Sequence, residues 1–223
     1  MQPPAARSRP RLTRTAVIAA AVDLADRDGI DALTMRKLAQ AIGVEAMSLY
    51  HHVANKDDLL DGMVDAVFSE ITAPRAGEPF RPELKARCES LRAALLRHPW
   101  AVGRLDSRRS PGLATLQHHE AVLACLRADG FDVRATALAF ATIDAFVYGF
   151  AVQEVSLPIE TGDDAAELAT EIFESVDQAA LPHLAEIAFE HASRADYAFA
   201  NEFGPGLDLV LDGIDRLRSA HPR

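Results

Sequence analysis

The sequence predicts an all-α protein, and three observations lead to that fold class. Alanine, the strongest helix former, accounts for 41 of the 223 residues. β-branched and aromatic residues never gather into the alternating apolar and polar runs that form half-buried strands. Apolar residues instead recur three and four positions apart, as they do from Leu207 to Leu217 near the C-terminus. We therefore expect helices joined by loops.

The N-terminal quarter predicts a basic arm and four short helices. Residues 1–12 carry three arginines and three prolines without an apolar period, which is typical of a flexible arm. The first helix is expected to end at Gly29 and the second before Gly43, and the third covers about residues 45–52. The N-cap residues expected for the first, second and fourth helices are Thr13, Thr34 and Asn55.

A linker divides the chain into two domains. Proline and glycine crowd into residues 74–82, and such a cluster interrupts helices. We therefore expect one domain over residues 13–72 and a second over residues 83–218. The helices expected in the second domain cover residues 83–97, 112–129, 132–155, 163–180 and 205–218, with a less regular stretch at 181–203.

The formal charge is unevenly distributed along the chain, whose total is −10. Residues 1–56 hold 8 Lys/Arg and 5 Asp/Glu, a balance of +3, whereas residues 57–223 hold 15 and 28, a balance of −13. Only the N-terminal segment therefore has a charge that a phosphate backbone would attract.

Composition excludes several other classes of protein. The content of 49% hydrophobic and 25% charged residues is ordinary for a globular protein and too apolar for a disordered one. Two cysteines exclude a disulfide scaffold. The chain has no run of 18 apolar residues and no apolar segment of the signal-peptide kind at its start, so we expect no membrane span and a cytosolic location.

Ala39, Gly43 and Leu49 have the spacing of a helix-turn-helix. Two helices that cross near a right angle over a turn of roughly three to four residues need a small residue at their contact, which Ala39 provides. The turn needs a residue that tolerates positive φ, which Gly43 provides. Leu49 then faces inward to a small core. A helical hairpin in an ordinary α-protein is the alternative interpretation.

The second helix of this motif would turn its outward face to the major groove of DNA. Its outward residues are Ala46, Met47, Ser48, Tyr50, His51 and His52. Lys56 begins the next helix, where its side chain is placed to meet a phosphate.

Several runs in residues 33–60 resemble the tetracycline-repressor (TetR) family of bacterial regulators. They read Leu-Thr-Met-Arg-Lys-Leu-Ala-Gln at 33–40, Gly-Val at 43–44, Ser-Leu-Tyr-His-His-Val at 48–53 and Asn-Lys-Asp-Asp-Leu-Leu at 55–60. The resemblance extends over about residues 13–72, and the run from Leu49 to Lys56 is particularly close to the tetracycline repressors themselves.

The resemblance implies a three-helix DNA-binding head, an all-helical regulatory body and a homodimer on palindromic double-stranded operator DNA. The residues expected at the DNA are then Thr34, Arg36, Lys37, Ala46, Met47, Ser48, Tyr50, His51, His52 and Lys56. One departure matters, because Ala46 and Met47 stand where tetracycline repressors place a base-reading polar residue and then proline. Apolar side chains can meet a thymine methyl group, but the operator sequence is not transferable.

Some of these residues have alternative roles. Tyr50 either contacts DNA or packs under its own helix. His51 and His52 point about 100° apart on a helix, so we expect at least one to contact DNA and do not expect the pair to hold a metal. The arginines of the N-terminal segment either enter the minor groove or remain solvated, and they are Arg7, Arg9, Arg11 and Arg14.

The C-terminal body resembles the tetracycline-repressor regulatory domain more loosely, over about residues 83–218. The helix expected at 132–155 alternates small and aromatic residues, which lets a second helix approach closely. This favours a dimeric four-helix bundle with the helix at 205–218, and intramolecular core is the alternative. The interface candidates are Phe146, Gly149, Val210 and Ile214.

An effector pocket is expected among the helices between the linker and residue 155. Its candidate residues are Leu91, Trp100, Leu105, His119, Val122 and Asp144, although Trp100 suits core packing equally well. Residues 101–106 lack the histidine that tetracycline repressors use for the metal-chelated drug. The His-His-Glu run at 118–120 also lacks metal-ligand spacing. We therefore expect no metal, no other cofactor, and a small apolar or amphipathic effector.

The sequence favours regulation over catalysis. It contains no G-x-S-x-G motif, no P-loop and no complete G-x-G-x-x-G, so we predict no enzymatic activity. The first hypothesis is a one-component repressor that a small molecule releases from DNA. The alternatives are an activator on the same scaffold, and an α-helical small-molecule-binding or enzymatic protein with a vestigial helix-turn-helix.

Overall fold

The structure is a computed structural model, and it describes residues 12–104, 111–157, 161–176 and 178–219. Every regular element within these residues is helical, which confirms the all-α prediction. Contacts divide the chain into two compact units. The first joins residues 1–71 with 93–120, and the second joins residues 72–92 with 121–223.

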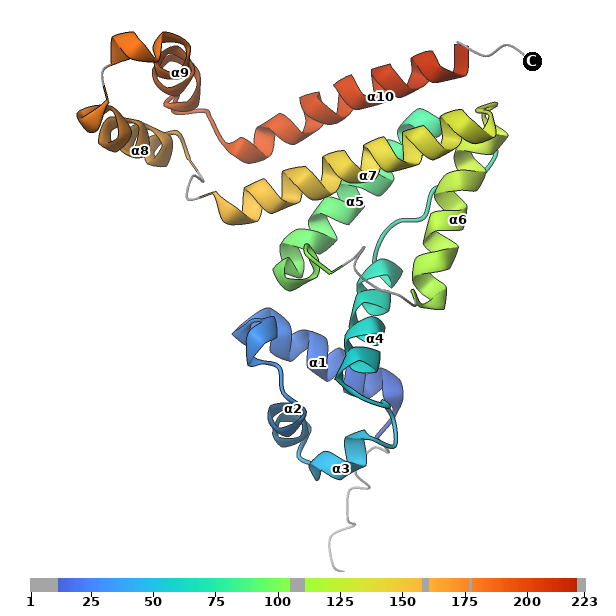
Figure 1. The fold of residues 1–223 in the computed structure, drawn as a ribbon. Coiled ribbons are helices and arrows are strands. Elements are labelled where there is room, and N and C mark those ends of the chain that lie inside the picture. The colour runs from blue at the N-terminus through green and yellow to red at the C-terminus, as the bar shows by residue number, and fades with distance from the viewer. Residues whose placement is uncertain (1–11, 105–110, 158–160, 177, 220–223) are drawn as a thin grey trace, which may run out of the picture. The chain divides into compact units, whose positions relative to one another are not determined.

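The first unit begins with the three helices of the expected DNA-binding head and a fourth helix, α4, and these four helices together are called the head below (Figure 1). They are α1 (Arg14–Asp28), α2 (Met35–Ile42), α3 (Ala46–Leu49) and α4 (Lys56–Ser69). The expected N-caps of α1, α2 and α4 are confirmed, because each side chain accepts a hydrogen bond from a backbone N–H three residues later. The third helix was expected over about 45–52 but has one regular turn, and residues 50–52 continue it as a hydrogen-bonded turn.

Gly43 makes the turn between α2 and α3. It has φ 77° and ψ 38°, in the left-handed region, and its N–H donates to the carbonyl of Ala39 at 2.9 Å. A side chain at this φ would be strained, so glycine ends α2 as the sequence predicts. Leu38 and Leu49 on either side of the turn are fully buried, which fixes the two helices on a common core.

A second glycine allows α1 and α4 to cross closely. A Cβ atom added at Gly62 would lie 2.6 Å from Cδ1 of Ile18. The two helices bury Val17, Ala21, Leu59 and Met63 in the head core. Gly62 therefore permits the close crossing of α1 and α4.

The rest of the first unit comes from residues 93–120. This segment contains the end of α5 (Phe80–Arg97), a short 3-10 helix (Pro99–Ala101) and the first half of α6 (Leu113–Ala128). The Asp65 carboxylate of α4 accepts hydrogen bonds from the N–H and hydroxyl of Thr115, at 2.9 and 3.0 Å. An α4 side chain thus caps the first turn of α6.

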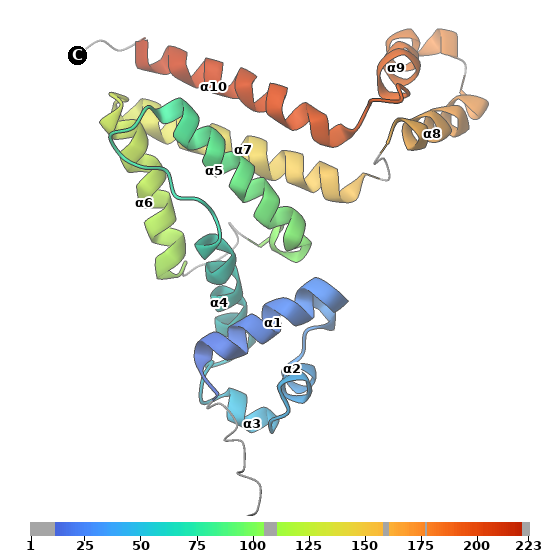
Figure 2. The same ribbon diagram turned by 180° about the vertical axis from the view of Figure 1, so that it is seen from behind.

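The second unit is built on two long helices, α7 (Val133–Ser156) and α10 (Phe203–Ser219), which run side by side in both views (Figures 1 and 2). Phe146 on α7 packs against Phe203 on α10 with ring centroids 5.5 Å apart. A Cβ atom at Gly206 would lie 3.0 Å from Cζ of Phe146, so glycine permits this close approach. The small and aromatic residues of α7 therefore serve packing within the chain on this face.

The segment between these helices contains the helix predicted near residues 163–180 and then the less regular stretch predicted over residues 181–203. It contains α8 (Gly162–Ser175), two 3-10 helices (Gln178–Ala180 and Phe199–Glu202), α9 (Pro182–Glu186) and a π-helix (Ile187–Ala192). Helix α8 begins with a capping box between Thr161 and Asp164 and ends five residues before the expected limit of 180.

Helix α7 is long and apolar enough, by length and composition alone, to cross a membrane. The sequence shows no uninterrupted apolar run at this helix, because the charged residues Arg134, Asp144 and Glu154 interrupt it. Only 33% of its most apolar window is buried inside this chain, so the helix carries an exposed apolar face.

Candidate functional site

The recognition segment, residues 46–52, presents an exposed face at its outer side. Met47 is 72% exposed and Tyr50 45%, and His51 is also exposed, while Leu49 between them is fully buried. The three exposed residues stand three and four positions apart, which places them on one side of a helical turn. Three of the six residues that the sequence predicts to face outward are therefore exposed here.

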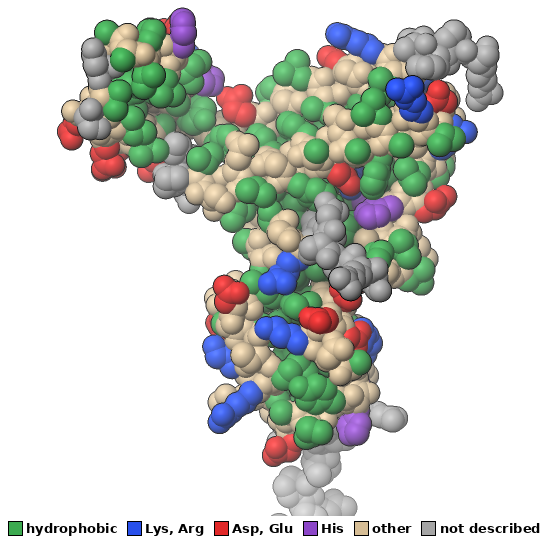
Figure 3. Space-filling view, in the orientation of Figure 1, with side chains coloured by type: hydrophobic (Ala, Val, Ile, Leu, Met, Phe, Trp, Pro, Cys, Tyr) green, Lys and Arg blue, Asp and Glu red, His purple; other side chains and the backbone are tan. Residues whose placement is uncertain are grey.

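Cationic side chains accompany this face. Arg36 and Lys37 are exposed on α2, and Lys56 is exposed at the first turn of α4. Figure 3 shows Lys and Arg side chains spread over the head, with hydrophobic side chains between them. Between residues 35 and 56 the sequence holds three Lys/Arg and one carboxylate, that of Glu45. The local charge therefore favours a polyanionic partner.

The other predicted contact residues have mixed exposure. Ala46, Ser48 and His52 are half-buried, and Thr34 is exposed but its hydroxyl accepts the Lys37 N–H that caps α2. A shallow surface groove lies between α2 and α3, and it is lined by Arg36, Ala39, Gln40, Val44, Glu45 and Ala46. Gln40 and Glu45 line this groove but are not among the contact residues predicted from the sequence, although both lie close to Gly43 in the chain.

An ion pair that the sequence does not predict connects α1 and α4 to the end of the recognition segment. The Arg14 guanidinium on α1 contacts the Asp58 carboxylate on α4 and donates to the carbonyl of His52 at 2.9 Å. The hydrogen bond from Arg14 lowers the pKa of Asp58 below its usual range. The sequence offers minor-groove contact or solvation as the role of Arg14, and neither describes this ion pair. Arg7, Arg9 and Arg11 lie outside the described residues.

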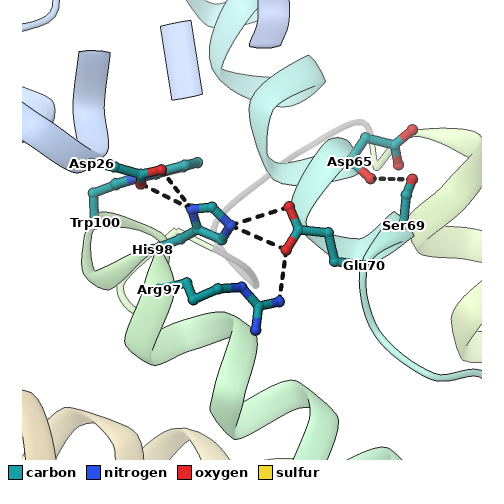
Figure 4. A network of polar contacts seen from close by, with 7 residues as sticks. All are labelled: Asp26, Asp65, Ser69, Glu70, Arg97, His98 and Trp100. Carbon is teal, nitrogen blue, oxygen red and sulfur yellow. Dashed lines mark hydrogen bonds and ion pairs between the residues drawn. The ribbon is translucent and has the colours of Figure 1, made fainter. Parts of the chain in front are cut away.

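A buried histidine joins α1 and α4 to the end of α5 (Figure 4). The His98 ring is 8% exposed, and its Nδ1 lies 2.9 Å from the Asp26 carboxylate while Nε2 lies 3.2 Å from that of Glu70. Burial raises the pKa of Glu70, but hydrogen bonds from Arg97 and His98 outweigh burial and the net pKa is lowered. The network makes residues 97–100 part of the first unit.

The same network accounts for Trp100. Its indole Nε1 donates to Asp26 at 2.6 Å, and the residue is 8% exposed. The side chain is thus held against α1.

The other pocket candidates divide between the two units. His119 is half-buried on α6, with its ring 5.4 Å from that of Phe68. Leu91 and Val122 are fully buried in the second unit. Leu105 lies outside the described residues.

Asp144 forms a buried ion pair in the second unit. Its Oδ1 lies 2.5 Å from Nη1 of Arg87, whose side chain is fully buried. Burial opposes the charge of Arg87, but the attraction of Asp144 together with smaller favourable interactions with Cys88 and Tyr148 outweighs burial, and the net pKa of the guanidinium is raised. Asp144 is therefore engaged by a cation of its own chain.

The dimer candidates differ in exposure. Ile214 is 2% exposed, and Phe146 is half-buried against Phe203, so both are packed within the chain. Gly149 is exposed and Val210 half-buried. In Figure 3 the surface over α7 and α10 is mostly hydrophobic or uncharged along its middle.

Metal and thiol chemistry find no support in the described part of the chain. No group of three or more His, Cys, Asp or Glu side chains there is arranged to hold a metal ion. Burial raises the pKa of Cys88 and of Cys125 to about 11, so both thiols stay protonated at neutral pH.

The head, its turn glycine and its exposed face define a helix-turn-helix DNA-binding protein with an α-helical body. Residues 17–63 match the family model of bacterial regulatory proteins of the tetR family, and residues 73–218 match the tetracyclin repressor-like C-terminal domain. The chain therefore belongs to the TetR family of transcriptional regulators.

Relatives agree with this assignment. The chain is 33% identical to the class A tetracycline repressor from transposon 1721 of Escherichia coli, over 93% of both chains. It is 42% identical to an HTH-type transcriptional regulator of Saccharopolyspora erythraea, over 64% of this chain and 61% of that relative. Thus this chain spans less than two thirds of the latter relative.

Solved structures show the same fold. ActR of Streptomyces coelicolor without ligand has a TM-score of 0.80 at 27% identity, covering 96% of this chain and 99% of that one. ActR in complex with actinorhodin has a TM-score of 0.74 at 28% identity, covering 92% and 97%.

Proposed function

We propose that the protein is a one-component repressor that binds a palindromic operator as a homodimer and is released by a small apolar or amphipathic molecule. The exposed face of the recognition segment carries this proposal. Met47, Tyr50 and His51 project from a turn whose inner side is anchored by buried Leu49, and cations flank them. Operator DNA lies in the bacterial cytosol, which is therefore the proposed site of action.

The DNA contacts proposed are those expected from the sequence, with distinct roles. Lys37 and Lys56 would meet phosphates, which fix the register of the protein on the duplex. Arg36 has the donor geometry that recognises guanine in the major groove. Arg14 is left out of this set, because its guanidinium is engaged by Asp58 and His52.

The proposed dimer interface lies on the exposed sides of α7 and α10. Leu138 and Val152 on α7 are 52% and 46% exposed, and they share a helical face with the exposed small residues Ala145 and Gly149. On α10, Leu209 is 75% exposed. Small residues allow close helix approach across a two-fold axis, which forms a four-helix bundle. Such a dimer would set two recognition segments about 34–36 Å apart for successive major grooves.

The proposed release by a ligand rests on the helical body. ActR, which shares this fold, has been solved in complex with actinorhodin. A ligand that binds better to one body geometry shifts the population toward it, and a coupling of about 1–3 kcal/mol per site is enough for a strong switch. No metal, cofactor or catalytic step is proposed.

The test is a selection of duplexes from random DNA by the full chain, followed by titration of the enriched duplex. We expect an inverted repeat, and we expect Arg36→Ala to weaken its binding. Arg134→Ala is the matched control, because Arg134 is an exposed arginine on α7 in the second unit. The proposal would be overturned if the selection enriched no sequence, or if Arg36→Ala and Arg134→Ala lowered the affinity for the enriched duplex equally.

A further inference from the structure

We propose that Met47 reads the C5-methyl group of a thymine, so that each operator half-site is preferred with a T·A pair at one position. The inference rests on the proposed function, because it requires the recognition segment to enter the major groove. It assigns a specificity role to a residue at which the sequence departs from the tetracycline-repressor pattern.

The exposure of Met47 is the first observation. In the head, over the described residues 12–71, the exposed large hydrophobic side chains are those of Met47 and Tyr50, and both belong to the recognition segment. Met47 is the more exposed of the two, at 72%. An apolar side chain of this size gains free energy from leaving water, so a partner surface that covers it gains affinity. Its flexible thioether adapts to an irregular surface.

The chemistry of the surroundings identifies the partner. Three Lys/Arg and a single carboxylate lie within residues 35–56, a balance that attracts a phosphate backbone rather than an apolar protein face. In the major groove, the C5-methyl group of thymine is the one apolar group that the base edges offer. An apolar side chain held over those edges therefore discriminates thymine from the other bases.

The neighbours of Met47 leave this contact to its side chain. Ala46 carries only a methyl group and cannot form a bidentate hydrogen bond to a base, and both Ala46 and Ser48 are half-buried. Leu49 is fully buried and faces the core. Met47 is consequently the exposed side chain among these residues of α3.

The experiment replaces thymine by deoxyuridine, one position at a time, in the duplex enriched by the selection. This exchange removes the methyl group and leaves the Watson–Crick hydrogen bonds unchanged. We expect one position per half-site at which wild-type affinity falls about three- to fivefold, the change that corresponds to burying one methyl group. At that position Met47→Ala should bind the thymine and uracil duplexes equally.

Three controls isolate the contact. Met47→Leu keeps an apolar side chain and should retain the preference for thymine. Tyr50→Ala and Ser48→Ala change neighbours on the same segment, and both should retain the preference even where overall affinity falls. Because Met47 is exposed, its variants should unfold at the wild-type temperature, which a melting curve checks. A C·G pair at the sensitive position should bind weakly, and 5-methylcytosine there should recover part of the loss.

The outcomes separate this inference from the proposed function. Failure to enrich any duplex would overturn the proposed function itself. Tight, specific binding with no thymine sensitive to uracil would overturn the role of Met47 alone. A uracil effect that persists in Met47→Ala but vanishes in Tyr50→Ala would assign the methyl contact to Tyr50 and would equally refute the inference.

Discussion

Arg14 on α1 and Asp58 on α4 form a two-pronged ion pair, with Nη1 to Oδ2 at 2.9 Å and Nη2 to Oδ1 at 2.7 Å. The same carboxylate accepts the N–H of Ala54 at 2.7 Å, and the same guanidinium donates to the carbonyl of His52. The pair therefore joins the first helix of the head to the end of the recognition segment. This connection orients the residues that we propose to face DNA.

Asp58→Asn is expected to lower the stability of the head by about 1 kcal/mol, because it removes one charge of a partly exposed pair. It should also weaken operator binding, because the recognition segment loses its support. Urea unfolding and operator titration measure the two effects. Asp57→Asn is the matched control, since Asp57 is an exposed carboxylate in the same helical turn. This substitution should lower the stability by only about 0.3 kcal/mol, through the lost interaction of the carboxylate with the helix dipole.

The pH dependence of this variant gives a second measurement. The folded pKa of Asp58 is lowered by Arg14, so its stabilising contribution is complete above the unfolded pKa of about 3.9. The contribution is lost as the pH falls through the lower, folded pKa. Wild type and Asp58→Asn should therefore differ most at neutral pH and converge below about pH 4. A difference that grows as the pH falls would contradict the ion pair.

Asp26→Asn should destabilise the first unit by about 1–2 kcal/mol, because it weakens the hydrogen bonds from His98 and Trp100. Trp100 is the sole tryptophan of the chain, so its fluorescence reports this contact directly. We expect a red-shifted emission in Asp26→Asn. Asp23 is exposed one turn earlier on the same helix, and Asp23→Asn should leave emission and stability unchanged, because the hydrogen bonds to His98 and Trp100 are made by Asp26. Equal behaviour of the two variants would show that the network contributes nothing.

The sequence predicts local features of this fold well and distant contacts poorly. The N-cap side chains of Thr13, Thr34 and Asn55 accept hydrogen bonds from backbone N–H groups three residues later, so residue type and spacing suffice to predict them. Gly43 ends its helix through its own positive φ, which residue type also predicts. By contrast, Asp26 and Trp100 are 74 residues apart. No local pattern in the sequence indicates that these two residues meet.

The same reason limits prediction of the interface. Helical periodicity shows that α10 has an apolar stripe, but it does not show which part α7 of the same chain covers. Ile214 on this stripe is 2% exposed and Val210 on the same stripe is half-buried, whereas the exposed Leu209 lies off the stripe. Only the packing of the two helices separates them.

Leu209→Glu should convert the proposed dimer to monomers that keep their helical content, because it places charge on an exposed face of α10. Ile214→Glu should instead lower the stability of the chain by several kcal/mol, about 3 or more, because it buries a charge within the core. Sedimentation and thermal melting separate these outcomes. Leu116→Glu is the control, since Leu116 is 50% exposed on α6. A wild-type chain that sediments as a monomer at micromolar concentration would refute the proposed dimer.

An apolar or amphipathic compound should release the protein from its operator without a metal ion. The prediction follows from the apolar helices of the body and from the missing histidine in residues 101–106. Operator release is measured with a panel of apolar compounds, and with tetracycline plus Mg²⁺, each with and without chelator. Release by tetracycline that depends on Mg²⁺ would show that the effector class is wrong.

The most direct test of the central claim is the operator affinity of Tyr50→Ala, His52→Ala and Lys56→Ala over a series of salt concentrations. All three variants should weaken binding while the fold and the oligomeric state remain unchanged. Lys56→Ala should weaken binding to all duplexes about equally and reduce the slope of log affinity against log salt by about one, because one phosphate contact is lost. Wild-type affinity and an unchanged salt slope in all three variants would contradict the placement of the DNA-binding surface on the recognition segment.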